Sequence, residues 1–484
     1  MRTFAALARG GVLALAVCTA AVAAVVPGGP ADAVVLRSDS GAWLWQGTTR
    51  TVGNVRDDVN FGGLPSTVQP TGKGVGIALI DTGVAAVPGL MSGNVVNGPD
   101  LSFDSQDPAT RYIDGFGHGT HLAGLISART PELTGLAPDA RLTSIKVGAS
   151  NGAVDVSQVI AGIDWATAHR NDDPQNPIRV MVLAYGTDST QDYTIDPLSA
   201  AVENAWRAGI TVFVSGGNSG LSARLLDPAS DPTVIAVGAM DDNGTADWSD
   251  DKVADFTSGG TSARYLDLVS AGRSLVSLRA PGSYIDTAYP SARVGTDYFV
   301  GSGSSQAAAV AAAVAADLLE AFPKLLPDQI KALFKNSALY TTAANNVNYK
   351  LLDIARAWHT YTQTPTAYNV NVTSQKRNVP STGTGSLEGS RGTVHVSDGT
   401  AQLTGESDLF GAFSTKSWAS ASAAQKAWSG GTWMGHDWTA TGYTTDAYGL
   451  SSWSGRAWSG RAWSGRAWSG NSWASVGWQN AAWS

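Results

Sequence analysis

Between residues 74 and 357, short apolar runs alternate with longer stretches in which apolar residues recur every three or four positions. Five of the runs are apolar at nearly every position, which is typical of strands that are buried on both faces of a parallel sheet. We therefore predict strands over Gly76–Asp81, Leu142–Val147, Arg179–Gly186, Thr211–Gly217 and Thr233–Met240.

The stretches between these runs have the spacing of amphipathic helices. Pro323 ends the last long one because proline cannot continue a helix, and Pro327 opens a further helix. This alternation predicts an α/β fold with a doubly wound, mostly parallel sheet. The predicted helices cover His118–Arg129, Val154–Arg170, Leu198–Ala208 and Gln306–Phe322.

The first 33 residues have the composition of a secretory signal peptide. Arg2 and Arg9 give a positive start, and the apolar run 12–26 is short for a membrane span. Ala31-Asp32-Ala33 fits a cleavage site. We therefore expect a mature chain that begins near Val34, is exported to the extracellular space and contacts no membrane after cleavage.

The composition changes again beyond residue 360. Residues 361–386 are rich in Thr, Ser, Pro and Gly, which indicates a linker. Thr393–Ser397 and Thr400–Thr404 flank Asp398-Gly399, a dipeptide that favours a two-residue hairpin turn. The predicted segments are a signal peptide (1–33), an N-terminal extension (34–70), the α/β domain (71–360), a linker with a small hairpin (361–412) and an aromatic repeat (413–484).

Aromatic residues occupy every fifth position of the last segment. The series runs from Trp428 to Trp483, and Phe413 and Trp418 share a register that Ala423 breaks. Five helical steps leave no common face and five strand steps alternate faces, so inward Trp side chains require a bend in each unit. Ser-Gly can supply the bend, which predicts a β-solenoid; a flexible Gly/Ser-rich tail is the alternative, and both stay open.

Charge and cysteine content exclude several classes of protein. The chain has 32 Lys and Arg against 40 Asp and Glu, a net charge of −8, which excludes a broadly basic, duplex-binding protein. The single cysteine, Cys18, lies in the predicted signal peptide, so a disulfide framework and a cysteine-ligated zinc site are excluded. With 43% hydrophobic residues, wholesale disorder is excluded too.

Four short motifs carry the residue types of nucleophilic catalysis. That chemistry needs a hydroxyl that attacks, an imidazole that takes its proton, a carboxylate that orients the imidazole and donors for the oxyanion. Asp81 ends a predicted strand, Asn218 follows another, and His118 and Ser305 lie where predicted helices begin; an α/β sheet places its site at such positions. Taken singly, the same residues are typical of turns and helix caps.

Taken together, in the order Asp, His, Ser, the motifs resemble those of the subtilases, the subtilisin-like serine peptidases. The resemblance extends from about Gly74 to Ala357. The motifs that carry it are Asp81-Thr82-Gly83, Gly117-His118-Gly119-Thr120-His121, Lys146-Val147, Ile163-Asp164-Trp165-Ala166, Ser215–Gly220, Ala229–Ala239, Gly301–Ala309 and Leu352-Asp353.

The resemblance implies a subtilisin-like fold and a serine endopeptidase that acts on protein or peptide substrates. It places the family's acid on Asp81, its base on His118, its nucleophile on Ser305 and its oxyanion asparagine on Asn218. His121 matches a second histidine of the family, with a structural role. The substrate peptide would lie between two edges, Gly152, Ala153, Val154 and Ala184, Tyr185, Gly186, with Tyr185 as a wall.

The sequence departs from the family's pattern in a few places. Ser304 stands where Thr is usual, and Ala309 where Pro is usual, but neither change removes a catalytic group. Ala184 replaces a residue of the usual Asn-x-Ser-x-Gly edge, although a peptide can still pair with main-chain groups. Residues 34–70 are shorter than the family's usual inhibitory pro-domain, so none is predicted there.

Cofactors and further partners are less constrained. No cofactor or metal is predicted, and the acidic loop Asp104–Asp107 leaves calcium open. Trp residues with interleaved Arg in the repeat favour cell-wall or polysaccharide contact over nucleic acid, whereas self-stacking without a ligand is the plainer interpretation. The alternative function is a catalytically silent scaffold that displays the repeat.

Overall fold

The computed structural model describes residues 34–37, 43–46, 51–241, 249–365, 378–397, 402–438 and 454–455. The predicted signal peptide (1–33) and the Asp398-Gly399 turn lie outside the described residues, as does the repeat beyond residue 438 apart from residues 454–455. Most of the predicted α/β domain and the first units of the repeat are therefore described.

A central sheet of ten strands runs through the described part of the chain, in the order β16-β17-β12-β8-β7-β6-β3-β5-β4, with β9 paired to β8. The pairs from β17 to β4 are parallel, whereas β16–β17 and β8–β9 are antiparallel. The doubly wound, mostly parallel sheet is thus confirmed. Its strands are β3 (Gly76–Asp81), β4 (Val95–Asp100), β5 (Arg141–Lys146), β6 (Ile178–Leu183), β7 (Thr211–Ser215), β8 (Ile235–Asp241), β9 (Lys252–Val253), β12 (Leu268–Ala271), β16 (Leu339–Thr342) and β17 (Asn348–Leu351).

The order of the strands reverses at β3. The chain passes from β3 to β4 and β5 on one side and then crosses to β6 on the other. Doubly wound proteins bind ligands in the crevice beyond the carboxyl ends of the strands at such a switch point. Asp81, the last residue of β3, therefore lies at the switch point, on the edge of the sheet formed by the carboxyl ends of the strands.

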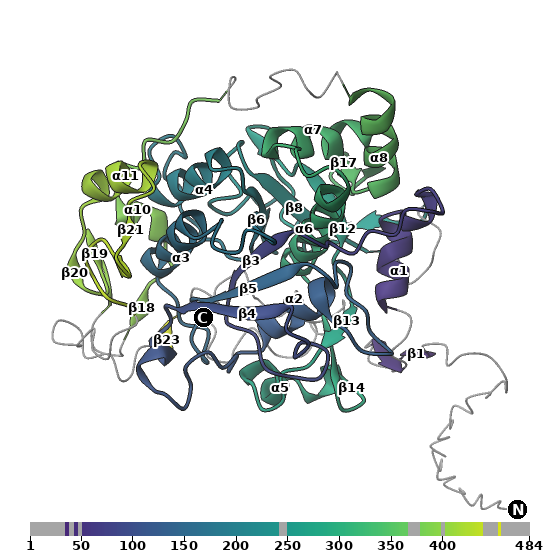
Figure 1. Ribbon diagram of the computed structural model, residues 1–484, viewed down its shortest axis with the longest axis horizontal. Helices are drawn as coiled ribbons and strands as arrows, with labels where there is room; N and C mark the ends of the chain where they lie inside the picture. Colours follow the sequence, from purple (N-terminus) through teal and green to yellow (C-terminus); the bar gives the residue numbers. More distant parts are fainter. Residues whose placement is uncertain are drawn as a thin grey trace, which may run out of the picture.

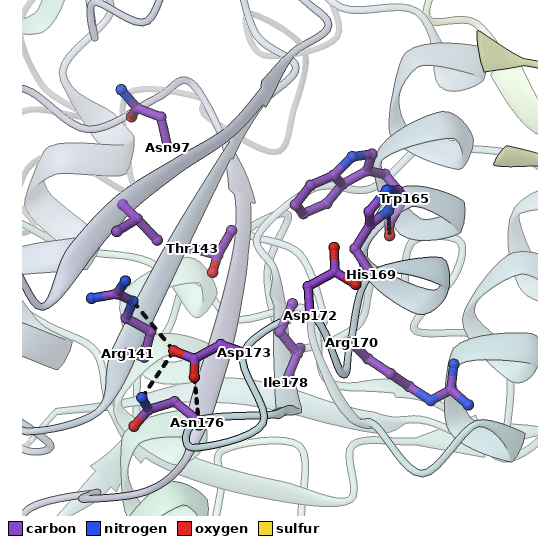
Figure 2. A pocket seen from close by; sticks show the side chains of 11 residues that line it. Asn97, Arg141, Thr143, Trp165, His169, Arg170, Asp172, Asp173, Asn176 and Ile178 are labelled. Atoms are coloured by element: carbon purple, nitrogen blue, oxygen red, sulfur yellow. Dashed lines mark hydrogen bonds and ion pairs between the residues drawn. The ribbon is translucent and has the colours of Figure 1, made fainter. Parts of the chain in front are cut away.

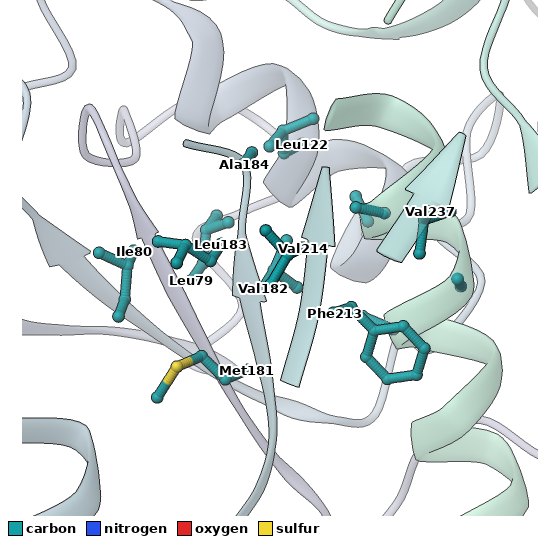
Figure 3. Close-up of a cluster of buried hydrophobic side chains, with 14 of the residues drawn as sticks. Leu79, Ile80, Leu122, Met181, Val182, Leu183, Ala184, Phe213, Val214 and Val237 are labelled. Atoms are coloured by element: carbon teal, nitrogen blue, oxygen red, sulfur yellow. The ribbon is translucent and has the colours of Figure 1, made fainter. Parts of the chain in front are cut away.

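The middle of the sheet is buried on both faces, as the apolar runs predicted. Every residue of β3 and β7 is buried, and Ile80 pairs with Ile145 on one neighbouring strand and Leu183 on the other. Figure 3 shows the resulting cluster, in which Leu122 of a covering helix lies over the strands. Full burial of each large aliphatic side chain stabilises the fold by about 1.5–3 kcal/mol.

Two pairs of helices cover opposite faces of the sheet (Figure 1). α2 (His118–Ser127) packs against α6 (Ser304–Ala321), and α3 (Val156–Ala168) packs against α4 (Pro197–Arg207). In α6 every residue from Ser304 to Leu319 is buried, and its small alanine side chains let the helix lie close to the strands. Ala309, at the family's usual proline position, lies within this uninterrupted helix.

Several element boundaries differ from the prediction by a few residues. β6 ends at Leu183 and β7 at Ser215, earlier than predicted, because the chain leaves the sheet before the glycines that follow. Gly217 has a φ of 111°, which no extended strand adopts. α3 begins at Val156, two residues late, because the Asp155 side chain caps its first turn by accepting from Ser157 N.

A three-stranded antiparallel ribbon precedes α6 and consists of β13 (Leu275–Leu278), β14 (Arg293–Val294) and β15 (Tyr298–Gly301). The other helices of the domain are α1 (Thr51–Asp58), α5 (Tyr284–Ala288), α7 (Pro327–Ser337) and α8 (Ile354–Gln363). Its short elements are β10 (Gly260–Thr261), β11 (Arg264–Tyr265), η1 (Phe61–Gly63), η2 (Phe103–Gln106) and η3 (Pro290–Ala292). Upstream, β1 (Val34–Arg37) and β2 (Trp43–Gln46) pair with each other.

Residues 378–397 and 402–438, called here the C-terminal layer, pack against α3 and α4 (Figure 1). The segment 361–412, predicted as a linker with a small hairpin, contributes Leu387, Leu403 and Leu409 to the common core. The layer contains α10 (Leu387–Arg391), α11 (Thr415–Ala423), β19 (Ser407–Asp408), β20 (Gly411–Ala412), β21 (Trp428–Ser429) and β22 (Thr432–Trp433), while β18 (Val396–Ser397) pairs with β23 (Ser454–Gly455).

The described tryptophans of the repeat face inward. Trp418, Trp433 and Trp438 are fully buried, and Trp428 is nearly so. The indole N–H groups of Trp418 and Trp433 donate to the same carboxylate oxygen of Asp164 in α3, at 2.8 and 2.9 Å. Ser422 Oγ donates to the other oxygen. One buried carboxylate thus anchors three side chains of the layer.

The solenoid expectation is wrong for the first unit of the repeat. Trp418 lies in helix α11, which begins after Ser414, whose hydroxyl accepts from Ser417 N. The run from Thr415 to Ala423 contains only Thr, Lys, Ser, Trp and Ala, with neither glycine nor proline to supply the expected bend. Trp428 and Trp433 pair across the short ribbon β21–β22, and the units beyond residue 438 lie outside the described residues.

We expect Asp164→Leu to destabilise the folded protein, because two indole N–H groups and the Ser422 hydroxyl would be buried without their acceptor. A buried group left unsatisfied costs about 1–3 kcal/mol, so the free energy of unfolding should fall by at least about 2 kcal/mol. Asp164→Asn keeps an acceptor oxygen and should lose less. Urea unfolding in a Ser305→Ala background measures both, and an unchanged Leu variant would contradict the anchoring role.

Candidate active site

Asp81 and His118 meet at the switch point of the sheet. Asp81 ends β3, His118 opens α2, and Nδ1 of the imidazole lies 2.7 Å from Oδ1 of the carboxylate. Both side chains are buried. A carboxylate accepts but does not donate, so Nδ1 carries the hydrogen, and in the neutral ring Nε2 carries the lone pair.

Burial sets the protonation of this pair. It lowers the pKa of His118 well below the ordinary value, with a smaller contribution from His121. Burial also raises the pKa of Asp81, opposed by the hydrogen bond from Thr82 N and by the charge of Lys146. The imidazole is therefore neutral near pH 7 and able to accept a proton at Nε2.

The glycines beside His118 are required by close packing. A Cβ on Gly119 would collide with the carbonyl oxygen of Gly83 and come within 3.1 Å of Asp81 Oδ1. Gly117 has a φ of 103°, a conformation that other residues rarely adopt. The start of α2 can thus lie directly against the end of β3.

Asp114 organises the same junction, and the sequence analysis missed it. Its Oδ1 accepts from Thr82 Oγ1 at 2.8 Å and from Gly117 N at 2.7 Å, and its Oδ2 accepts from Thr120 N and Oγ1 at 2.8 and 2.5 Å. Thr82 Oγ1 in turn accepts from Gly119 N at 3.0 Å. The signal that could have revealed it is an acid just before the glycine-flanked start of a helix.

Asn218 and the first turn of α6 form a second junction. Asn218 Oδ1 accepts from Ser304 N at 2.9 Å, and Ser304 Oγ accepts from Gly217 N at 3.1 Å. The hydroxyl at the family's threonine position thus makes a defined contact. Ser305, the next residue, is the second residue of α6 and is buried.

The two junctions share one edge of the sheet. β6 separates β3 from β7, and the three strands are parallel, so their carboxyl ends lie about 10 Å apart across two strand spacings. α2 and α6 also pack against each other. The structure therefore brings Asp81 and His118 into direct contact, and Asn218 to the start of the helix that carries Ser305, at the same edge.

His121 has a structural position. Its Nε2 lies 3.2 Å from the carbonyl oxygen of Leu275 in β13 and 3.1 Å from that of Phe299 in β15. Burial lowers its pKa to about 4, so it is neutral. A Cβ on Gly301 would come within 2.9 Å of the ring, which explains a glycine there. His121 thus ties α2 to the ribbon that leads into α6.

The two expected substrate edges are loops rather than strands. Residues 152–154 follow a turn at residues 150–151 and lead into α3; Ala149 N donates to Ala153 O at 3.0 Å, and Gly152 has a φ of 82°. Residues 184–186 follow the end of β6. All six residues are buried.

Tyr185 is not the open wall that the sequence suggested. Only 1% of the residue is exposed, and burial raises the pKa of its phenol well above 10, with the nearby charges of Asp155 and Arg391 acting in opposite directions. Arg391 belongs to the C-terminal layer and lies in the segment 361–412, for which the sequence predicted a linker and a small hairpin.

In the acidic loop Asp104–Asp107, where calcium was left open, the carboxylate of Asp104 forms an ion pair with a lysine. Asp104 Oδ2 lies 2.9 Å from Lys146 Nζ and accepts from Ser150 Oγ at 2.7 Å. An ammonium group at this carboxylate opposes a cation there. Among the residues that the structure describes, no group of three or more His, Cys, Asp or Glu side chains is arranged to hold a metal.

A surface hollow of about 230 Å³ lies at the opposite end of the sheet (Figure 2). Its lining includes Arg141 and Ile178, the first residues of β5 and β6, together with Trp165, His169 and Asp173. It is therefore separate from the junctions at the carboxyl ends.

None of the helices in the described ranges has the length and apolar character needed to cross a membrane.

Comparisons with known proteins agree with this architecture. The model of the subtilase family matches residues 72–382. Serine protease AprX of Bacillus subtilis (strain 168) is 39% identical over 276 residues, which cover 55% of this chain and 61% of that protein. M-protease of Shouchella clausii (strain KSM-K16) is 33% identical over 280 residues, 57% and 62% of the two chains.

Subtilisin Savinase of Lederbergia lenta is 32% identical over 277 residues, 57% of this chain and 87% of that protein. The crystal structure of fervidolysin from Fervidobacterium pennivorans, a keratinolytic enzyme related to subtilisin, matches with a TM-score of 0.50 and 25% identity. That match covers 68% of this chain and 50% of fervidolysin. The chain spans about three fifths of the length of AprX and M-protease.

We expect Thr82→Val to weaken the junction at His118, because the change removes the acceptor of Gly119 N and a donor to Asp114. The free energy of unfolding should fall by about 1–3 kcal/mol, with a loss of any activity that depends on the position of His118. Thr82→Ser keeps the hydroxyl and is the matched control. Urea unfolding of the three proteins measures the effect, and equal stability of Val and Ser variants would contradict it.

Proposed function

This chain belongs to the subtilase family, and from that premise we propose that it is an exported serine endopeptidase. Asp81, His118 and Ser305 would act as the triad, and Asn218 as an oxyanion donor. The observation that carries the proposal is the 2.7 Å hydrogen bond between buried Asp81 and His118 at the switch point. The related proteins named as proteases support the same class of reaction.

In the proposed mechanism, His118 Nε2 takes the hydroxyl proton of Ser305 as Ser305 Oγ attacks the peptide carbonyl carbon. Asp81 holds Nδ1–H and stabilises the imidazolium that forms. The proton then passes to the leaving amine, and the C–N bond breaks to leave an acyl-enzyme. Water, activated in the same way by His118, releases the acid product and restores Ser305.

The oxyanion would be held by Asn218 and by the main chain of α6. The bond from Ser304 N to Asn218 Oδ1 fixes the amide, so that Nδ2 is its donor side. The Ser305 N–H at the start of α6 is a second donor, and the helix terminus favours negative charge. Donors held in place before the reaction are effective because they need no reorganisation.

The substrate would be a protein or peptide chain in an extended conformation. We place it between the loops 152–154 and 184–186, where main-chain groups would pair with its backbone. Export rests on the predicted signal peptide, residues 1–33.

The alternative of a silent scaffold that displays the repeat receives no support from the described residues. Trp418, Trp428, Trp433 and Trp438 are buried, so none of them offers a free face to a polysaccharide. Cell-wall contact through the repeat would therefore depend on residues beyond 438.

We expect a fluorophosphonate probe to label the wild-type protein and not Ser305→Ala, because only an activated hydroxyl reacts with it. Ser302→Ala, a change at a second serine of the same segment, is the matched control and should keep its labelling. Mass spectrometry of the labelled peptide locates the modified residue. Labelling that persists in Ser305→Ala would assign the nucleophile elsewhere.

We expect Asn218→Ala to slow kcat by about 10²–10³-fold with little change in KM, which is the loss known for removal of the oxyanion asparagine in subtilisin itself. The physical reason is that Nδ2 would donate more strongly to the oxyanion than to the neutral carbonyl of the bound substrate. Asn218→Asp keeps the acceptor for Ser304 N but loses the donor, so its kcat should fall as well. Recovery of kcat in the Asp variant would show that Asn218 acts only by holding Ser304.

A further inference from the structure

Arg391, the last residue of α10, is a fully buried cation in the C-terminal layer. Its Nε donates to Asp155 Oδ2 at 2.7 Å, and Nη1 donates to the carbonyl oxygen of Gly405 at 2.7 Å. Glu388 and the carbonyl oxygen of Ser407 are further acceptors. These partners hold the buried guanidinium in one place. Removing either Arg391 or Asp155 alone would leave the charge of the other buried and uncompensated. The subtilase match ends at residue 382, so it assigns no role to Arg391.

The partner of Arg391 ends one of the two loops of the proposed groove. Asp155 follows Val154 directly and caps α3 by accepting from Ser157 N at 3.0 Å and Ser157 Oγ at 2.5 Å. The charge and hydrogen bonds of Arg391 lower the pKa of Asp155 despite its burial, so the carboxylate stays ionised. The ion pair therefore fixes the end of the loop 152–154.

The neighbours of Arg391 hold the other loop. Thr187 follows Gly186 directly, and its Oγ1 donates to the carbonyl oxygen of Ser390 at 2.5 Å. Asp188 accepts from Thr393 N at 2.7 Å and from Thr393 Oγ1 at 2.5 Å. Residues 390–393 thus contact the segments that end both loops.

The close contact between residues 390–393 and Asp188 requires a glycine at position 392. Its φ is 62°, and a Cβ there would collide with Asp188 Oδ1 and come within 2.7 Å of Ser189 N. Asp188 can therefore receive Thr393 only because residue 392 has no side chain.

We propose that residues 390–393, with Arg391 at their centre, are a positioning element of the substrate groove. They set the separation of the loops 152–154 and 184–186 and so determine the affinity for extended peptides. Arg391 is a positioning residue and not a catalytic residue, because it acts through Asp155 and does not touch the substrate. This inference rests on the proposed endopeptidase function.

The test uses the full chain with the paired change Arg391→Met and Asp155→Asn, which removes both buried charges together. We expect KM for an eight-residue fluorogenic peptide to rise about ten-fold or more, because small misplacements of binding groups are costly. The rate of fluorophosphonate labelling should stay within about two-fold of wild type, since neither Ser305 nor His118 is held by the pair of Arg391 and Asp155. Far-UV circular dichroism and urea unfolding check that the variant is folded.

Arg170→Met is the matched control. Arg170 Nη1 donates to Gln425 Oε1 of the C-terminal layer at 2.9 Å, so this change removes a contact of the layer that does not touch either loop. Its KM should remain that of wild type. If the paired variant does not fold, Thr393→Val carries the test, because it removes only the bond from Oγ1 to Asp188 and should raise KM by a few-fold.

The outcomes separate the two claims. If the paired variant is folded and labelled normally but its KM is unchanged, the positioning role is overturned and the endopeptidase proposal stays intact. Equal losses of labelling and peptide turnover, or the same rise of KM in Arg170→Met, also overturn it, because they indicate general destabilisation. Absence of labelling in the wild type overturns the proposed function, and with it the inference.

Discussion

The hydrogen bond between Asp81 and His118 joins the central strand of the sheet to the first helix that covers it. It can form only because β3 is buried on both faces, ends at the point where the strand order reverses, and meets a helix whose first turn carries glycines on either side of the histidine. Asp114 and Thr82 then hold the helix start against the strand end. The fold thus fixes the imidazole before any substrate is present, which is what an electrostatically preorganised site requires.

Buried carboxylates recur throughout this chain, and their partners decide their charge. Asp155 faces a guanidinium, and its pKa is lowered. Asp164 accepts from two indoles and a hydroxyl, which carry no charge, and burial raises its pKa to about 6. Asp81 faces a neutral imidazole, so that a positive charge develops beside it only when the ring takes a proton. One residue type therefore pairs with a cation in Asp155, anchors two indoles in Asp164 and orients an imidazole in Asp81, according to the donors around it.

The sequence predicted the structure best where an element or a site depends on residues that are close together in the sequence. Runs that are apolar at nearly every position predicted the central strands, because both faces of those strands are buried. Asp81 and His118 were recognisable from short motifs, since the glycines that their packing requires lie next to them. Asp114 was missed because its partners are backbone N–H groups and threonine hydroxyls, which the sequence does not identify; its one sequence signal is its place just before the glycine-flanked start of α2. The docked aromatic units were missed because Trp418 and Trp433 bind an acid more than 250 residues earlier, and a five-residue period says nothing about such a partner.

The position of the C-terminal layer has a consequence for how the site is assembled. The loops that flank the proposed groove follow β5 and β6, but the residues that hold them lie between 390 and 393, and Arg391 is 236 residues from Asp155. A chain that has folded only as far as the family match, residue 382, would leave Asp155 buried or exposed without its cation. An unpaired carboxylate at the cap of α3 prefers solvent, so the loop before it would not be held in its final place. Docking of the layer would therefore complete the proposed groove as well as the core, because residues 390–393 contact the segments that follow the loops after β5 and β6.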